Sequence, residues 1–85
     1  MKHDGLQTGI EHRIAELRAA HPRISFCRAT LEDWREDGEA RYSLGLDIRW
    51  PQHQSLIGGP SRASAGQAVD AGFDKAARTL GQSHA

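Results

Sequence analysis

The stretch Glu39-Ala40-Arg41-Tyr42-Ser43-Leu44-Gly45-Leu46-Asp47-Ile48-Arg49-Trp50 decides the fold, because apolar and polar residues alternate along its whole length. Its even-numbered residues are apolar or aromatic, and its odd-numbered residues are charged or small. A strand directs successive side chains to opposite faces of its sheet, so this pattern gives one apolar face and one polar face. The stretch therefore predicts a long β-strand with one face against a core.

The preceding segment supplies the partner of this strand. Residues Ile24 to Trp34 also alternate, and Asp37-Gly38 tolerates the positive φ angles of a two-residue hairpin loop. Pairing Glu36 with Glu39 across the loop sets Leu31, Ala29 and Cys27 opposite Leu44, Leu46 and Ile48 on the inner face. The same register sets Phe26 against Arg49, Arg28 against Asp47 and Trp34 against Arg41 on the outer face. We therefore predict an antiparallel hairpin in this register.

Two capping boxes predict where helices begin, because a hydroxyl and a carboxylate or amide three residues later satisfy free backbone N–H groups. Thr8-Gly9-Ile10-Glu11 predicts a helix over Gly9 to Ala20, which His21-Pro22 ends. Ser64-Ala65-Gly66-Gln67 predicts a final helix that continues to Gly81.

A short third strand is predicted between the hairpin and the final helix. The turn Pro51-Gln52-His53 leads into Gln54 to Gly58, where Leu56 is expected to point inward, and Gly58-Gly59-Pro60 ends the strand. Met1 to Gln7 is too short and polar for a further strand, so we expect three strands in the sheet.

The predicted order is helix, strand, strand, strand, helix, in one domain over residues 1–85 with an ordered core over about residues 8–81. The expected fold class is α+β, a two-layer α-β-β-β-α sandwich whose three-stranded antiparallel sheet carries both helices on one face. The double-stranded-RNA-binding domain has this topology, but it needs a lysine cluster at the start of its second helix, where this chain offers only Arg62. We interpret the likeness as shared topology rather than shared function.

Length and charge limit the classes of function. The 85 residues carry 11 Lys and Arg against 11 Asp and Glu, a balance that argues against a strongly basic nucleic-acid grip but is compatible with a local basic patch. A chain of this length has no room for a deep cofactor cleft, and no cofactor is expected. There is no secretory signal or apolar run of the ~20 residues that span a membrane. The single cysteine, Cys27, cannot form an internal disulfide, so a cytoplasmic location is expected.

Three segments carry a resemblance to a known family. They are Pro22 to Glu32, the strand Tyr42 to Trp50 with the turn Pro51-x-His53, and the helix Ala68 to Leu80. The turn is similar to a family Pro-Gly-His, and the helix to a family run of Ala, acid, Ala, hydrophobic, Asp, Lys and later Arg and Leu. From about Ile10 to Leu80, the chain resembles the ribosome hibernation-promoting factor and ribosome-associated translation inhibitor family.

The resemblance implies a bacterial, cytoplasmic, non-enzymatic protein that binds the small ribosomal subunit and modulates translation under stress. It also implies that Lys75 and Arg78, with Arg62 just before the last helix, contact ribosomal phosphate. The same cations are equally expected as compensation for the helix dipole, so both interpretations stay open. The basic tail of ribosome-binding members has no counterpart in Gly81 to Ala85, and a short member of the family is therefore expected.

The outer face of the sheet is the other candidate binding surface. Its candidate residues are Phe26, Arg28, Trp34, Arg41 and Arg49. Arginines interleaved with aromatic rings can pair with phosphates and stack on bases. The same residues also form ordinary cross-strand pairs, Arg49 over Phe26 and Arg41 over Trp34, with Asp47 neutralising Arg28. On the residues alone the structural interpretation is favoured, and the exposed rings suit a protein partner at least as well.

The remaining reactive residues predict no chemistry. The acidic residues Glu32, Asp33, Glu36, Asp37 and Glu39 gather at the hairpin tip, without the ligand order of a calcium loop, and predict a solvated tip. The histidines His3, His12, His21, His53 and His84 lack metal-ligand spacing, so no metal site is expected. Cys27 points inward and is expected to be an inert thiol. No catalytic arrangement can be assigned, and we expect no enzyme.

The edge of the strand Ile24 to Trp34 supports a second hypothesis. Without a further strand beside it, this edge presents unpaired N–H and C=O groups, which proteins rarely leave open. The N-terminal residues can cover the edge, or a second copy can pair there to form a homodimer. The alternative function is therefore a protein-interaction module that acts as a homodimer or as the partner of a larger protein.

Overall fold

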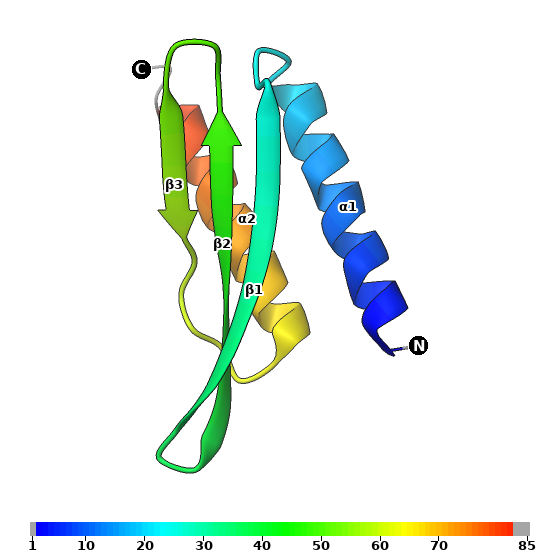
Figure 1. Ribbon diagram of the computed structural model, residues 1–85, viewed down its shortest axis with the longest axis vertical. Helices are drawn as coiled ribbons and strands as arrows, with labels where there is room; N and C mark the ends of the chain where they lie inside the picture. Colours follow the sequence, from blue (N-terminus) through cyan, green and yellow to red (C-terminus); the bar gives the residue numbers. More distant parts are fainter. Residues whose placement is uncertain (1, 83–85) are drawn as a thin grey trace.

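The computed structural model describes the backbone of residues 2–82 and the side chains of residues 5–81. Its elements are α1 (Lys2–Ala20), β1 (Phe26–Glu36), β2 (Glu39–Arg49), β3 (Gln54–Gly58) and α2 (Ala65–Gln82). The strands form one antiparallel sheet in the order β1-β2-β3. Figure 1 shows α2 behind β2 and α1 alongside β1, with the front of the sheet uncovered. The predicted two-layer α+β fold is confirmed.

The hairpin register is also confirmed. β1 and β2 pair from Phe26 with Arg49 through to Glu36 with Glu39, so both predicted faces are correct. The loop residues Asp37 and Gly38 both have positive φ, at 53° and 80°, as a two-residue hairpin turn of this hand requires. The period of two and the turn residues were sufficient to set this register.

The predicted start of the first helix is wrong, because α1 begins at Lys2 instead of Gly9. Leu6 packs against the hydrophobic core one turn before Ile10, so burial favours helix continuation through Thr8. Glu11, the expected capping partner, instead accepts a hydrogen bond from Gln7 Nε2 at 3.3 Å. The predicted start of the last helix is confirmed, since α2 begins at Ala65 and Ser64 Oγ accepts the Gln67 N–H at 3.2 Å, which is one of the two hydrogen bonds of the predicted capping box.

The predicted inward residue of β3 is also wrong. Leu56 is 75% exposed on the outer face, whereas Ile57 is 7% exposed and belongs to the core. The turn after β2 pairs Arg49 with Gln54, and that register sets Leu46 beside Ile57 and Asp47 beside Leu56. Because Leu46 faces the core, its neighbour must do so as well, and Leu56 then points to solvent.

The core lies between the sheet and the two helices. It consists of Leu17, Ile24, Leu44, Leu46, Ile48, Ile57, Val69, Phe73, Ala76 and Leu80. The central strand β2 and the helix α2 supply most of these side chains, while α1 adds Leu17 and a stripe of half-buried residues. This arrangement commits the inner face of the sheet to packing, so the surfaces available for binding are the outer face, the sheet edges, the loops and the exposed sides of the helices.

Candidate functional site

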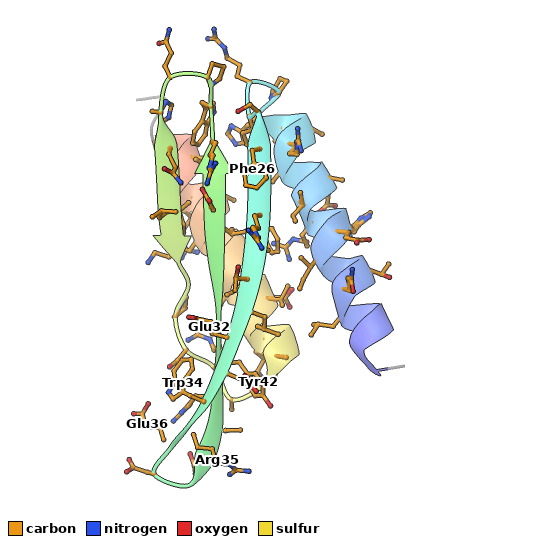
Figure 2. All side chains as sticks on the ribbon, in the orientation of Figure 1. Phe26, Glu32, Trp34, Arg35, Glu36 and Tyr42 are labelled. Atoms are coloured by element: carbon orange, nitrogen blue, oxygen red, sulfur yellow. The ribbon has the colours of Figure 1, made fainter. Side chains whose placement is uncertain are left out.

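The outer face of the sheet is uncovered, because α2 lies behind the sheet and α1 lies alongside β1 (Figure 1), and both helices direct their apolar side chains into the core on the inner face. The five residues predicted on it do lie on this face, but in two separate groups. Phe26, Arg28 and Arg49 lie at the end of the molecule where the loops meet, whereas Trp34 and Arg41 lie near the hairpin tip. Figure 2 shows Phe26 and Trp34 far apart along β1, and eight strand residues span roughly 26 Å.

The first group is held by a network of short contacts. The Arg49 guanidinium lies 5.0 Å from the centre of the Phe26 ring, which confirms the predicted cross-strand pair. Arg49 also donates to both carboxylate oxygens of Asp47, at 3.0 and 3.3 Å, and Gln54 Nε2 donates to Asp47 at 2.8 Å. Asp47 therefore binds Arg49 directly, and Arg28, its predicted partner, acts on it only through its more distant charge.

These contacts lower the pKa of Asp47 below its ordinary value. The hydrogen bond from Gln54 is the largest cause, followed by the hydrogen bond from Arg49, and the charges of Arg49 and Arg28 add to the effect. Asp47 thus stays ionised and neutralises Arg49. Arg28 is left as the cation of this group with no direct hydrogen bond to a described carboxylate.

The second group lies among carboxylates of the hairpin. Trp34 Nε1 donates to Glu36 at 3.3 Å, and Arg41 forms an ion pair with Glu39 at 3.8 Å. Arg41 is opposite Trp34 in the register, as predicted. The predicted contact of the Arg41 guanidinium with the Trp34 ring, however, is absent from the cation–π contacts of the described residues. The Glu39 carboxylate offsets the charge of Arg41 and weakens its attraction to a phosphate, so this group suits a nucleic-acid contact less well than the first.

The cations predicted near the last helix are not gathered into one site. Lys75 Nζ donates to the Gly58 carbonyl at 2.7 Å, which ties α2 to the end of β3. Arg62 donates to the Ser61 carbonyl and its backbone bridges to Tyr42. Arg62 and Arg78 line one hollow of about 550 Å³, and two carboxylates, Asp70 and Asp74, line it as well. Its charge is therefore mixed.

Sequence reasoning missed the arginine that joins the two helices. Arg13 of α1 donates to Asp70 at 3.1 Å and to Asp74 at 3.3 Å, and its guanidinium lies 5.1 Å from the centre of the Phe73 ring. The spacing of Asp70 and Asp74 by one helical turn is the only signal in the sequence. A partner more than 50 residues away in the chain could not be identified from it.

A pocket of about 390 Å³ lies between the α1–β1 loop, the β2–β3 loop and the end of α2, and we call it the end pocket. It is lined by His21, Arg23, Trp50, Pro51, Gln52, His53, Ser55, Thr79 and Leu80. The rings of Trp50 and His53 stack in it, with centroids 4.3 Å apart and planes 9° from parallel. The backbone N–H of Trp50 donates to the backbone carbonyl of His53 at 2.8 Å, and this tight turn holds the two rings in the stacked arrangement.

In the sequence, Pro51-Gln52-His53 predicts only a turn and carries part of the resemblance. The pocket could not be predicted from this segment, because the α1–β1 loop and the last turn of α2 complete its walls. Two rings that flank a two-residue turn are a signal that could have suggested the stack, but not the cavity beside it.

Cys27 lies on the inner face opposite Ile48, as predicted, but it is half-buried and not fully buried. Burial is the largest effect on its pKa and raises it, the nearby Arg18 charge lowers it, and Asp47 raises it again. Among the residues that the structure describes, no three His, Cys, Asp or Glu side chains converge as metal ligands. The side chains of His3 and His84 lie outside the described set.

Comparisons with known proteins add no assignment to this geometry. The sequence matches no protein-family model, and neither curated proteins nor solved structures show a significant match to the chain. Neither helix is long and apolar enough to cross a membrane within the described residues.

Proposed function

We propose that the chain is a non-enzymatic, ribosome-associated protein of the hibernation-factor type, which binds the ribosome or its RNA in the bacterial cytoplasm and modulates translation under stress. The uncovered outer face of the sheet carries this proposal, because Arg28 and the Phe26–Arg49 pair lie on it. An arginine beside an aromatic ring offers both a phosphate partner and a stacking surface. The resemblance over Ile10 to Leu80 supports the same function.

The distribution of charge supports RNA contact at one end of the molecule. The five carboxylates of the hairpin tip repel phosphate from that end. Outside residues 32–39 the chain carries 10 basic against 6 acidic residues, since one of the 11 basic residues, Arg35, lies in the tip itself. Arg23, Arg28 and Arg49 lie at or near the opposite end, where the loops meet. We therefore assign the RNA-facing surface to the loop end of the outer face.

The helix cations play a smaller part in this proposal. Lys75 is engaged with the Gly58 carbonyl, and Arg62 and Arg78 share their hollow with Asp70 and Asp74. An RNA phosphate at the hollow would meet two carboxylates, so its attraction is weaker there than at Arg28. Arg78 can still contribute a peripheral contact.

Charge reversal tests this assignment of the surface. Arg28→Glu should weaken co-sedimentation with ribosomes by about tenfold or more, because it replaces an attraction to phosphate by a repulsion. The matched control is Arg35→Glu, which reverses the same charge at the acidic tip on the same strand. Equal losses in the two variants would contradict the assignment, since the contact would then depend on net charge alone.

One specific observation favours the alternative, a protein-interaction module. Leu56 is 75% exposed on the outer face, and Phe26 is 39% exposed on the same face. A hollow of about 500 Å³ is lined by Leu56 together with Gly45 and Gly58, and β1 is an edge strand. A second copy could use either surface. Such a contact would persist at high salt, whereas a phosphate contact would not.

A further inference from the structure

The end pocket presents an aromatic surface to solvent. Trp50 is half-buried and packs against the core, while His53 is exposed and stacks on it. The ring face of His53 turned away from Trp50 is thus available to a third ring. Stacking on protein side chains is the commonest way in which unpaired bases are held, because every base has a π-face.

A free cation stands beside this aromatic surface. Arg23 is exposed and lines the pocket, and it forms no hydrogen bond or ion pair with another residue in the described part of the chain. Arg13, Arg41 and Arg49, by contrast, each bind a carboxylate. None of the nine residues that line the pocket is acidic. A phosphate at Arg23 would therefore meet no opposing charge within the pocket.

The remaining walls can recognise the edge of a base. Besides Arg23 and the histidines, Gln52, Ser55 and Thr79 contribute an amide and two hydroxyl groups to the cavity wall. A volume of about 390 Å³ accommodates one nucleobase and not a folded helix of RNA. The pocket thus combines a stacking surface, a free cation and hydrogen-bonding groups within one small cavity.

We propose that the end pocket binds one unpaired nucleotide of single-stranded RNA, with its base stacked on the Trp50–His53 pair and its phosphate at Arg23. This inference rests on the proposed function, because it takes RNA as the ligand. It extends that function from a charged surface to a defined site. Arg28 and the Phe26–Arg49 pair lie on the adjoining outer face, where they can hold the neighbouring phosphates.

Tryptophan fluorescence tests the proposal directly. The chain has two tryptophans, so Trp34→Phe leaves Trp50 as the only one. A single-stranded ten-nucleotide adenylate RNA should quench Trp50 fluorescence in this background. His53→Ala should weaken the apparent affinity by about fivefold to 150-fold, the range for loss of one stacked base. Arg23→Gln, added separately, should also weaken the affinity and should lower the slope of log affinity against log salt by about one, because it removes one phosphate contact. His53→Phe keeps a ring and should retain binding, and Arg35→Gln serves as the remote control.

Each outcome is decisive. Absent quenching, or quenching that is unchanged in both His53→Ala and Arg23→Gln, overturns the proposal. Equal quenching by a short phenylalanine-containing peptide assigns the pocket to a protein partner and also overturns it. Co-sedimentation of the same variants with ribosomes distinguishes failure of the pocket proposal from failure of the proposed ribosome association. Pelleting without quenching overturns the pocket alone, whereas quenching without pelleting overturns ribosome association and leaves the pocket standing.

Discussion

Two glycines allow the central strand, the end of β3 and α2 to pack closely. A Cβ atom on Gly72 would lie 2.8 Å from Leu44 Cβ and 2.9 Å from Leu44 Cδ2, and Leu44 is completely buried. A Cβ atom on Gly59 would lie 2.8 Å from Gly72 Cα. The Gly59 N–H also donates to the Leu44 carbonyl at 2.8 Å. Helix propensity alone disfavours glycine at position 72, so packing determines the residue there.

Replacing Gly72 should therefore destabilise the fold. We expect Gly72→Ala to lower the free energy of unfolding by about 1–3 kcal/mol, because overpacking outweighs the gain of up to about 1 kcal/mol in helix propensity. Gly66→Ala is the matched control in α2, since its Cβ would meet open space, and it should be neutral or stabilising. Urea unfolding of both variants measures the difference. Equal effects would contradict the close approach.

The Asp47 contacts predict a specific dependence of stability on pH. The pKa of Asp47 is lowered in the fold, so its ionised form stabilises the native state above the ordinary pKa of an aspartate. That contribution is lost as the pH falls from about 4 through the lowered pKa. The free energy of unfolding should therefore decrease less steeply between pH 6 and about pH 2 in Asp47→Asn than in the unsubstituted protein. An NMR titration that places the Asp47 pKa at or above its ordinary value would refute the contacts.

At the scale of elements, the sequence was most informative where one pattern extends over many residues. The β1–β2 register follows from a long period-two pattern and from Asp37-Gly38, which allow no one-residue shift. The five-residue strand β3 has two adjacent apolar residues, Leu56 and Ile57, so only the turn before it decides which one is buried. The start of α1 depended on Leu6 reaching the core, a tertiary contact that a capping box cannot reveal.

The attachment of α1 depends on Arg13. Its guanidinium binds Asp70 and Asp74 and lies over Phe73, with its side chain 30% exposed. Arg13→Gln should lower the free energy of unfolding by about 1–2 kcal/mol, and part of this loss should vanish in 0.5 M salt, where exposed ion pairs are screened.

The neighbouring residue provides a control for this prediction. His12 pairs with Glu16 at 3.4 Å on the exposed side of the same helix. His12→Gln should change stability by less than about 0.5 kcal/mol, because exposed pairs within one helix contribute little. Denaturant unfolding of both variants at low and high salt measures the contrast. An Arg13→Gln effect as small as that of His12→Gln would show that α1 is held by its apolar stripe alone.

At the scale of the whole molecule, the acidic residues and the candidate binding groups lie at opposite ends. The hairpin tip carries the five crowded carboxylates, and the loop end carries Arg23, the Phe26–Arg49 pair and the end pocket. The sequence revealed the acidic tip, because its residues are close in the chain. It could not reveal the pocket, whose walls come from three separate segments. The split of the outer-face candidates into two groups, by contrast, follows from the predicted register, because Phe26 and Trp34 are eight strand residues apart.

The central claim is that the chain associates with ribosomes through phosphate contacts, and co-sedimentation with purified ribosomes at two salt concentrations tests it most directly. We expect the full chain to pellet with ribosomes at about 50 mM salt and to be released steeply by about 200 mM, because binding through phosphate weakens as counterions accumulate. Failure to pellet at about 50 mM salt, where such attraction is strongest, would contradict the claim, and so would pelleting that is indifferent to salt.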